Sequence, residues 1–134
     1  MLYRIRTGWG VPQQPNEAII IYVSSLPKVE EKGRPYVFTD RHAYLRTARF
    51  YRDRSALHDA IRWDLLQARD FRRDPDDPEK LERYQAEALV YDHLPAEALL
   101  GIICYTEAVA QDLRQQAQAL GLTLTIEPRP SWYL

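Results

Sequence analysis

Proline recurs so often along this 134-residue chain that short elements are expected over most of its length. There are nine prolines and only five glycines. Each proline lacks the backbone N–H that a helix interior or a central strand needs, and it restricts the residue before it. This pattern excludes a fibrous repeat and disfavours a bundle of long helices. A chain of this length supports one hydrophobic core, so we expect a single domain over residues 1–134.

Charge and apolar content are those of a folded chain. The formal net charge is -1 and 46% of the residues are hydrophobic, which argues against disorder. No apolar run is long enough to cross a bilayer, and the first residues lack the apolar core of a signal peptide. We therefore expect a cytoplasmic protein without membrane association.

The single cysteine excludes a disulfide framework and a zinc site built on paired thiolates. Cys104 lies in the apolar run 101–105. A free cysteine in such a run is usually a small buried hydrophobe, so core packing is favoured over a nucleophile.

Short apolar runs predict the strands. The run 18–23 is continuous and rich in β-branched residues, and we expect it to lie centrally in a sheet. Further strands are expected at 36–39, 86–91, 102–105 and 122–126.

Helical spacing of apolar residues predicts a helix within 55–71, and the proline- and aspartate-rich loop 73–78 follows it. Brief helices are expected at 79–84 and 95–100. The longest helix has the clearest boundaries, because Thr106 can cap its start and Gly121 can close it. Its apolar face consists of Val109, Leu113, Ala117 and Leu120. The irregular alternation of strands and helices favours an α+β domain.

Several kinds of site are absent from the sequence. No glycine-rich phosphate loop of either common type occurs, and no helical pair of histidines with a glutamate between them. His42, His58 and His93 are scattered and lack carboxylates at ligand spacing, so we expect no metal site.

A basic segment stands out against the neutral total. Between residues 41 and 54 there is one acid, Asp53, and five arginines: Arg41, Arg46, Arg49, Arg52 and Arg54. The planar guanidinium suits bidentate recognition of phosphate and stacking on bases. A solvated face with local ion pairs explains the same residues equally well, and the sequence leaves both interpretations open.

The tripeptide 85–87 opens one of the expected strands. Because side chains alternate along a strand, Gln85 and Glu87 should project to one side, toward a cleft, while Ala86, Ala88 and Val90 pack on the other. A carboxylate at the start of an apolar strand costs free energy unless it is paired or faces a site. The residues alone favour an ordinary strand-edge glutamate over a catalytic one.

Several segments together resemble one family. The segments 1–3, 22–25, 36–42, 85–90 and 132–133 occur in the order and at the intervals of the DarT family of DNA ADP-ribosyltransferase toxins. The resemblance covers nearly the whole chain. It implies an ADP-ribosyltransferase-like split mixed β-sheet with flanking helices, and transfer of ADP-ribose from NAD to a base of single-stranded DNA. It also implies a toxin–antitoxin pair in which a macrodomain antitoxin removes the modification.

The resemblance assigns roles to particular residues. Glu87 matches the catalytic glutamate, Tyr3 and Gln85 are expected to bind NAD, and no metal takes part. The region 41–83 corresponds to substrate recognition, with these expected DNA contacts: Arg41, His42, Arg46, Arg49, Arg52, Arg54 and Arg83. Tyr44, Phe50 and Tyr51 lie among the arginines and add the aromatic faces that unstacked bases need. Without the resemblance, we would interpret His42 as a histidine whose hydrogen bonds are made within a turn, and Phe50 as a core residue.

The chain departs from the family at its start. The resemblance implies that complete members have a preceding part, which grips NAD with a Tyr-His-Ile-Thr type motif and supplies a further catalytic arginine. Without those groups to orient NAD, we expect weak or absent transferase activity from this chain alone. We also expect an exposed sheet edge that favours self-association or a partner chain. The alternative function is a catalytically silent remnant that binds single-stranded nucleic acid or a partner protein.

Overall fold

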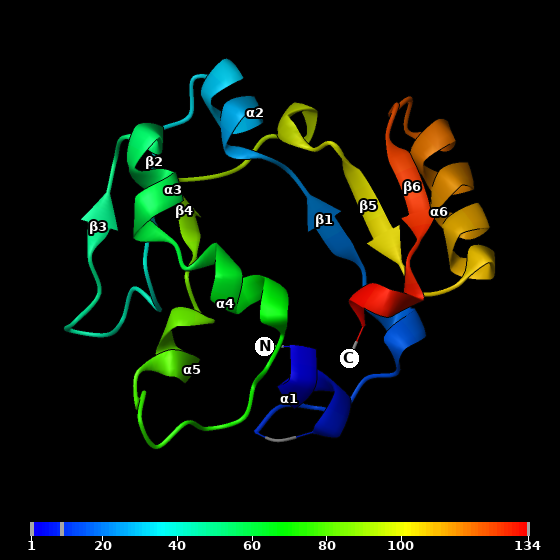
Figure 1. Ribbon diagram of the computed structural model, residues 1–134. Helices are drawn as coiled ribbons and strands as arrows, with labels where there is room; N and C mark the ends of the chain where they lie inside the picture. The colour runs from blue at the N-terminus through cyan, green and yellow to red at the C-terminus, as the bar shows by residue number, and fades with distance from the viewer. Residues whose placement is uncertain (1, 9, 134) are drawn as a thin grey trace. The chain divides into compact units, whose positions relative to one another are not determined.

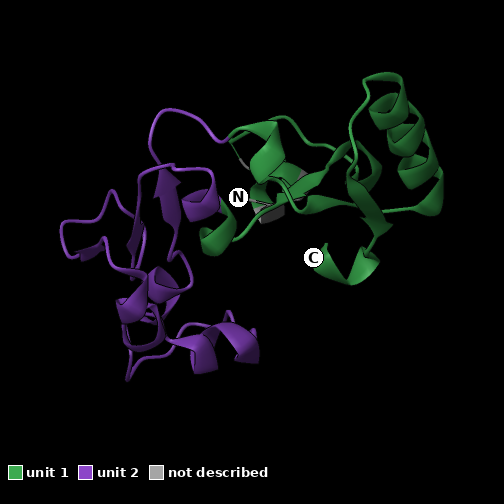
Figure 2. Ribbon diagram, turned by 90° about the horizontal axis from the view of Figure 1, so that it is seen from above, with its two compact units in different colours: residues 1–28, 95–134 green, residues 29–94 purple. Residues whose placement is uncertain are grey.

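The computed structural model describes residues 2–8 and 10–133, without the side chains of Leu2, Tyr3 and Arg6. The chain divides into two compact units, one formed by residues 1–28 and 95–134 and the other by residues 29–94 (Figure 2). The expected single domain over 1–134 stays a prediction.

The first unit contains a three-stranded sheet. Its order is β1-β5-β6, with β1 (Ile21–Val23) antiparallel to β5 (Gly101–Cys104) and β6 (Thr125–Pro128) parallel to β5 (Figure 1). The other elements are α1 (Leu2–Thr7), η1 (Asn16–Ala18), η3 (Ala96–Ala98), α6 (Glu107–Ala119) and η4 (Pro130–Trp132). Every residue of β5 is buried, so β5 takes the central position that we expected for the run 18–23. That expectation was wrong: β1 lies at the edge of the described sheet, and Tyr22 is 61% exposed.

The core of this unit lies between the sheet and α6. Ile102, Cys104, Ala110 and Ile126 are its buried members. The predicted core role of Cys104 is confirmed, and burial raises the pKa of its thiol. Gly101 permits the close approach of β6, because a Cβ there would overlap the carbonyl oxygen of Thr125.

The helix expected between Thr106 and Gly121 is confirmed as α6. The Thr106 hydroxyl accepts a hydrogen bond from the Val109 N–H, and Gly121 has a φ of 67°. Such a φ favours glycine, which ends the helix at the predicted place. The expected apolar face holds except at Leu120, which is 74% exposed. The strand expected at 122–126 begins later, since the Leu122 N–H still donates to Ala117 at the helix end.

The second unit contains an antiparallel sheet of order β3-β2-β4. Its strands are β2 (Tyr36–Thr39), β3 (Phe50–Tyr51) and β4 (Ala88–Val90). Phe38 is 2% exposed and stacks on Tyr51 with ring centroids 5.1 Å apart. Five short helices complete the set: α2 (Leu26–Glu31), which spans the sequence boundary between the units, η2 (Arg54–Ala56), α3 (Leu57–Ala60), α4 (Trp63–Ala68) and α5 (Lys80–Arg83).

The helix expected within 55–71 is interrupted. The backbone of Ile61 is extended, which ends α3, and the residue is only 7% exposed. The strand expected at 86–91 begins only at Ala88, because the Gln85 and Ala86 N–H groups donate to the end of α5. The strand 36–39 and the short helix in 79–84 are confirmed, and the brief helix at 95–100 is the 3-10 helix η3.

Each unit combines one three-stranded sheet with helices, which confirms the α+β class. Among the described residues, no helix is long and apolar enough to cross a membrane.

Candidate functional site

One of the two oxygens of the Glu87 carboxylate is held by hydrogen bonds. Glu87 precedes β4, and its backbone carbonyl accepts the Thr39 N–H of β2 at 2.9 Å. Its Oε1 accepts the backbone N–H of Ala43 at 2.7 Å and lies 3.0 Å from Nδ1 of His42. Within the described chain Oε2 has no hydrogen-bond partner, and the side chain is 33% exposed. The carboxylate is therefore oriented by the turn after β2 while one oxygen stays available.

His42 lies beside this carboxylate. Its Nδ1 is also 3.3 Å from the Tyr44 N–H. An unprotonated Nδ1 accepts from Tyr44, whereas a protonated Nδ1 donates to Glu87, so the ring can make only one of the two bonds at a time. The ring is 52% exposed and makes a contact across 45 positions of sequence that no local signal predicts.

Gln85 is not the neighbour of Glu87 on a strand face, and that prediction was wrong. It lies in the turn after α5, where its side-chain amide donates to the Leu81 carbonyl at 3.3 Å. Strand alternation does not apply because β4 begins at Ala88. The NAD-binding role of Gln85 stays a prediction, and the side chain of Tyr3 lies outside the described residues.

Arg41 is buried among carboxylates. The residue as a whole is 9% exposed, and its NH1 atom lies 3.0 Å from Oε2 of Glu82 and 3.3 Å from Oε2 of Glu79. Nε lies 3.5 Å from Asp40. Burial by itself lowers the pKa of the guanidinium, but these acidic neighbours raise it above its ordinary value, so Arg41 is charged. The charge of Arg41 is already compensated within the chain, and its expected contact with DNA stays a prediction.

Two further arginines of the predicted DNA-binding set are also paired. Arg83 NH1 lies 2.6 Å from Asp77, and its NH2 lies 3.2 Å from Glu79. Arg54 Nε lies 3.2 Å from Glu30. These contacts are the local ion pairs that the sequence left open as an alternative.

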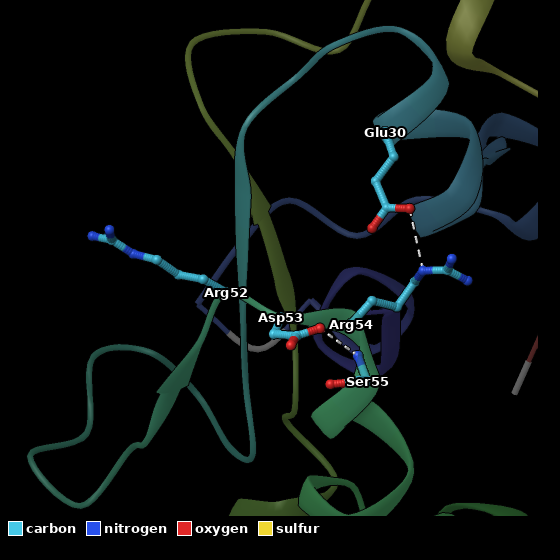
Figure 3. Close-up of a pocket in the computed structure, with 5 residues that line it drawn as sticks. All are labelled: Glu30, Arg52, Asp53, Arg54 and Ser55. Atoms are coloured by element: carbon cyan, nitrogen blue, oxygen red, sulfur yellow. Dashed lines mark hydrogen bonds and ion pairs between the residues drawn. The ribbon is translucent and has the colours of Figure 1, made fainter.

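The Glu30–Arg54 pair lines an open pocket of about 660 Å³, together with Arg52, Asp53 and Ser55 (Figure 3). Arg52 extends away from the pair in this view. Two cations and two anions line the pocket, so its charge is balanced and it does not favour a polyanion. Burial and the hydrogen bond to Glu30 raise the pKa of Tyr36 to about 12 and so keep its hydroxyl protonated.

Three arginines of the predicted DNA-binding set remain, and we call them, together with two aromatic residues of the same segment, the arginine–aromatic surface: Tyr44, Arg46, Arg49, Phe50 and Arg52. All five are exposed, Tyr44 at 90% and Phe50 at 56%. In the part of the chain that the structure describes, none of the three guanidinium groups has a carboxylate within ion-pair distance. The expectation that Phe50 is a core residue was wrong. Tyr51 takes the core position, since it stacks on Phe38.

Among the described residues, no group of three or more His, Cys, Asp or Glu side chains could hold a metal ion. The chemistry available at Glu87 is that of a carboxylate with a neighbouring imidazole.

A family model, curated relatives and solved structures all match this chain over nearly its whole length, and all point to the same family. A family model described as ssDNA thymidine ADP-ribosyltransferase, DarT, matches residues 1–134. The DNA ADP-ribosyl transferase of Escherichia coli O127:H6 is 49% identical over 134 residues, which are 99% of this chain and 61% of that protein. The chain thus spans about three fifths of that relative's length.

Two solved structures are also similar. Thermus sp. 2.9 DarT in complex with carba-NAD+ matches with a TM-score of 0.87 at 35% identity, over 99% of this chain and 67% of that one. The same protein in complex with ADP-ribosylated ssDNA matches with a TM-score of 0.86 at 34% identity, over 99% of this chain and 63% of that one.

Proposed function

This chain belongs to the DarT family, and we propose that it transfers ADP-ribose from NAD to a thymidine base of single-stranded DNA with Glu87 as the catalytic carboxylate. The family and the ADP-ribosyltransferase-like fold expected from the sequence are confirmed. The observation that carries the proposal is the half-bound carboxylate of Glu87, whose Oε1 is fixed by the Ala43 N–H.

The reaction needs a negative charge at a fixed place. As the bond between ribose C1′ and the nicotinamide nitrogen breaks, nicotinamide leaves with the bonding electrons and positive charge develops on the ribose. A carboxylate that is already oriented stabilises this charge without reorganising. The free Oε2 of Glu87 is suited to accept a ribose hydroxyl, and the carboxylate can take the proton that the attacking base loses as it bonds to C1′.

The arginine–aromatic surface supports a single-stranded polyanion as the acceptor. Arg46, Arg49 and Arg52 offer unpaired positive charge to phosphates, and Tyr44 and Phe50 offer exposed rings to unstacked bases. This combination is typical of single-strand binding and gives little selectivity between bases by itself. The choice of thymidine in the proposal rests on the family.

The other parts of the proposal rest on the family resemblance. NAD is the ADP-ribose donor, with Tyr3 and Gln85 as predicted contacts. A macrodomain antitoxin that removes the modification is the expected partner, and the cytoplasm is the expected place of action. Self-association through the edge of the sheet at β1 is a further expectation.

Transfer of label from NAD to an oligonucleotide tests the proposal. The chain is incubated with NAD labelled in its adenylate phosphate and a thymidine-containing single strand, beside a strand in which cytidine replaces every thymidine. We expect label on the first strand only, at the weak level expected from this chain alone. Glu87→Gln keeps an oxygen to accept the Ala43 N–H but removes the charge, and should lower transfer by about 10²-fold or more.

A silent remnant that binds single-stranded DNA is the second candidate. It is favoured by the exposed arginines and rings of the arginine–aromatic surface, which can bind a single strand without any part from Glu87. Oligonucleotide binding that weakens with salt, with no transfer by the wild-type chain, would select it over the first candidate.

A further inference from the structure

Arg41 is a buried cation for which the proposed chemistry has no use. Its side chain is 11% exposed, and its NH1 group contacts three side chains on two segments, Thr47, Glu79 and Glu82. The distances are 3.3, 3.3 and 3.0 Å respectively. Its Nε is buried and has no hydrogen bond among the described residues, so Asp40 at 3.5 Å supplies charge compensation only.

The contacts of Arg41, together with two hydrogen bonds within the segment, fix the conformation of the loop 40–49. The Arg41 carbonyl accepts the Thr39 hydroxyl at 2.6 Å, and Asp40 accepts the Arg49 N–H at 3.0 Å. The guanidinium then links Thr47 of the same loop to Glu82 of α5. The loop is thus fixed at its start, near its end and against a neighbouring helix.

The same loop carries the group that orients Glu87. Ala43 lies two residues after Arg41, and its N–H is the 2.7 Å donor to Glu87 Oε1. The backbone at Arg41 is fixed through its carbonyl by Thr39 and through its side chain by Glu82. We therefore expect the direction of the Ala43 N–H to depend on these two contacts.

We propose that Arg41 is a positioning residue that fixes the loop 40–49 so that the Ala43 N–H holds the Glu87 carboxylate, and that it does not contact DNA. The activity arm of this proposal rests on the proposed function of Glu87. NH1 makes the contacts with Thr47, Glu79 and Glu82, while Nε faces Asp40, so a lysine keeps the positive charge but lacks the second nitrogen beside Asp40. A phosphate cannot replace these acids while the guanidinium stays buried.

The amide proton of Ala43 reports the proposed geometry directly in a ¹H–¹⁵N NMR spectrum. A hydrogen bond to a carboxylate moves that proton downfield, and Glu87→Ala marks its position without the bond. We expect Arg41→Met to move the signal toward the Glu87→Ala position, and Arg41→Lys, which keeps the positive charge, to move it less. Arg52→Gln, which removes an exposed unpaired arginine, should leave the signal in place.

A second variant covers the case in which Arg41→Met does not fold. Glu82→Gln keeps the guanidinium and weakens its shortest contact, so it should move the Ala43 signal in the same direction by a smaller amount. An unchanged Ala43 signal in folded Arg41→Met, or in Glu82→Gln where Arg41→Met is unfolded, would overturn the proposal.

Kinetics and binding separate positioning from DNA contact. Arg41→Met should lower kcat for transfer by up to about 10²-fold, because the carboxylate is displaced. It should leave the affinity for a single-stranded oligonucleotide and the salt dependence of that affinity unchanged. A weaker affinity with a salt slope reduced by about 0.7 would show that Arg41 contacts phosphate and would refute the proposal. If the wild-type chain transfers nothing, the proposed function fails, and the NMR arm still decides the position of Ala43.

Discussion

Replacing Arg46, Arg49 and Arg52 together with glutamine should remove nearly all the salt dependence of single-stranded DNA binding. Each neutralised phosphate contributes about -0.7 to the slope of log affinity against log salt. Three unpaired arginines predict a slope of about -2, which means a loss of affinity of about 20-fold between 50 and 200 mM salt. Six arginines, the number that the sequence suggested, would give a slope of about -4 and a loss of about 300-fold.

Fluorescence anisotropy of a labelled oligonucleotide across a series of NaCl concentrations measures this slope. The control is Arg72→Gln, which removes an arginine that is 88% exposed but paired with Asp70 at 2.8 Å, outside the arginine–aromatic surface. We expect the wild type and this control to share a slope near -2. A wild-type slope near -4, or a triple variant that keeps the wild-type slope, would refute the assignment of DNA contacts from ion pairing.

Three further predictions concern the fold. Gly101→Ala should cost about 1–3 kcal/mol in unfolding free energy, measured by urea denaturation, because its Cβ would displace the Thr125 carbonyl; a neutral effect would contradict the close approach of β6. Phe38→Ala should cost about 3–5 kcal/mol in the same assay, since the ring is 2% exposed, and a loss below about 1 kcal/mol would contradict its core role. The raised pKa of Tyr36 stabilises the fold below pH 10, and this contribution is lost as pH rises toward about 12. Stability measured from pH 9 to 12 should therefore fall more steeply for the wild type than for Tyr36→Phe, which cannot ionise or bond to Glu30; equal slopes would contradict the shift.

The elements that could be predicted from the sequence are those set by local interactions. The helix α6 has its capping residue Thr106, its apolar spacing and its terminal Gly121 within one segment, and the structure confirms both ends. The expected helix in 55–71 had apolar spacing alone. There the backbone becomes extended at the buried Ile61, and apolar spacing does not reveal where a helix is interrupted.

The candidate site shows the same division. The family resemblance assigns the catalytic role to Glu87. Its hydrogen-bond partner Ala43 lies 44 positions away and donates through its backbone N–H, so the side chain at position 43 gives no sign of this contact. The basic segment was likewise recognised, but the sequence could not tell which arginines are neutralised. Two of the acids that pair with Arg41, Glu79 and Glu82, lie about 40 residues further along the chain, and only the fold brings them into contact with it.

The central claim, that Glu87 is the carboxylate for transfer to thymidine in single-stranded DNA, is tested most directly by the mass of the product. The chain is incubated with NAD and a thymidine-containing oligonucleotide, which is then examined by mass spectrometry for the addition of one ADP-ribosyl group. The account predicts this addition with the wild type and its loss with Glu87→Gln, while that variant still binds the oligonucleotide. Equal modification by the variant, or an unmodified oligonucleotide that the wild-type chain nevertheless binds, would contradict it.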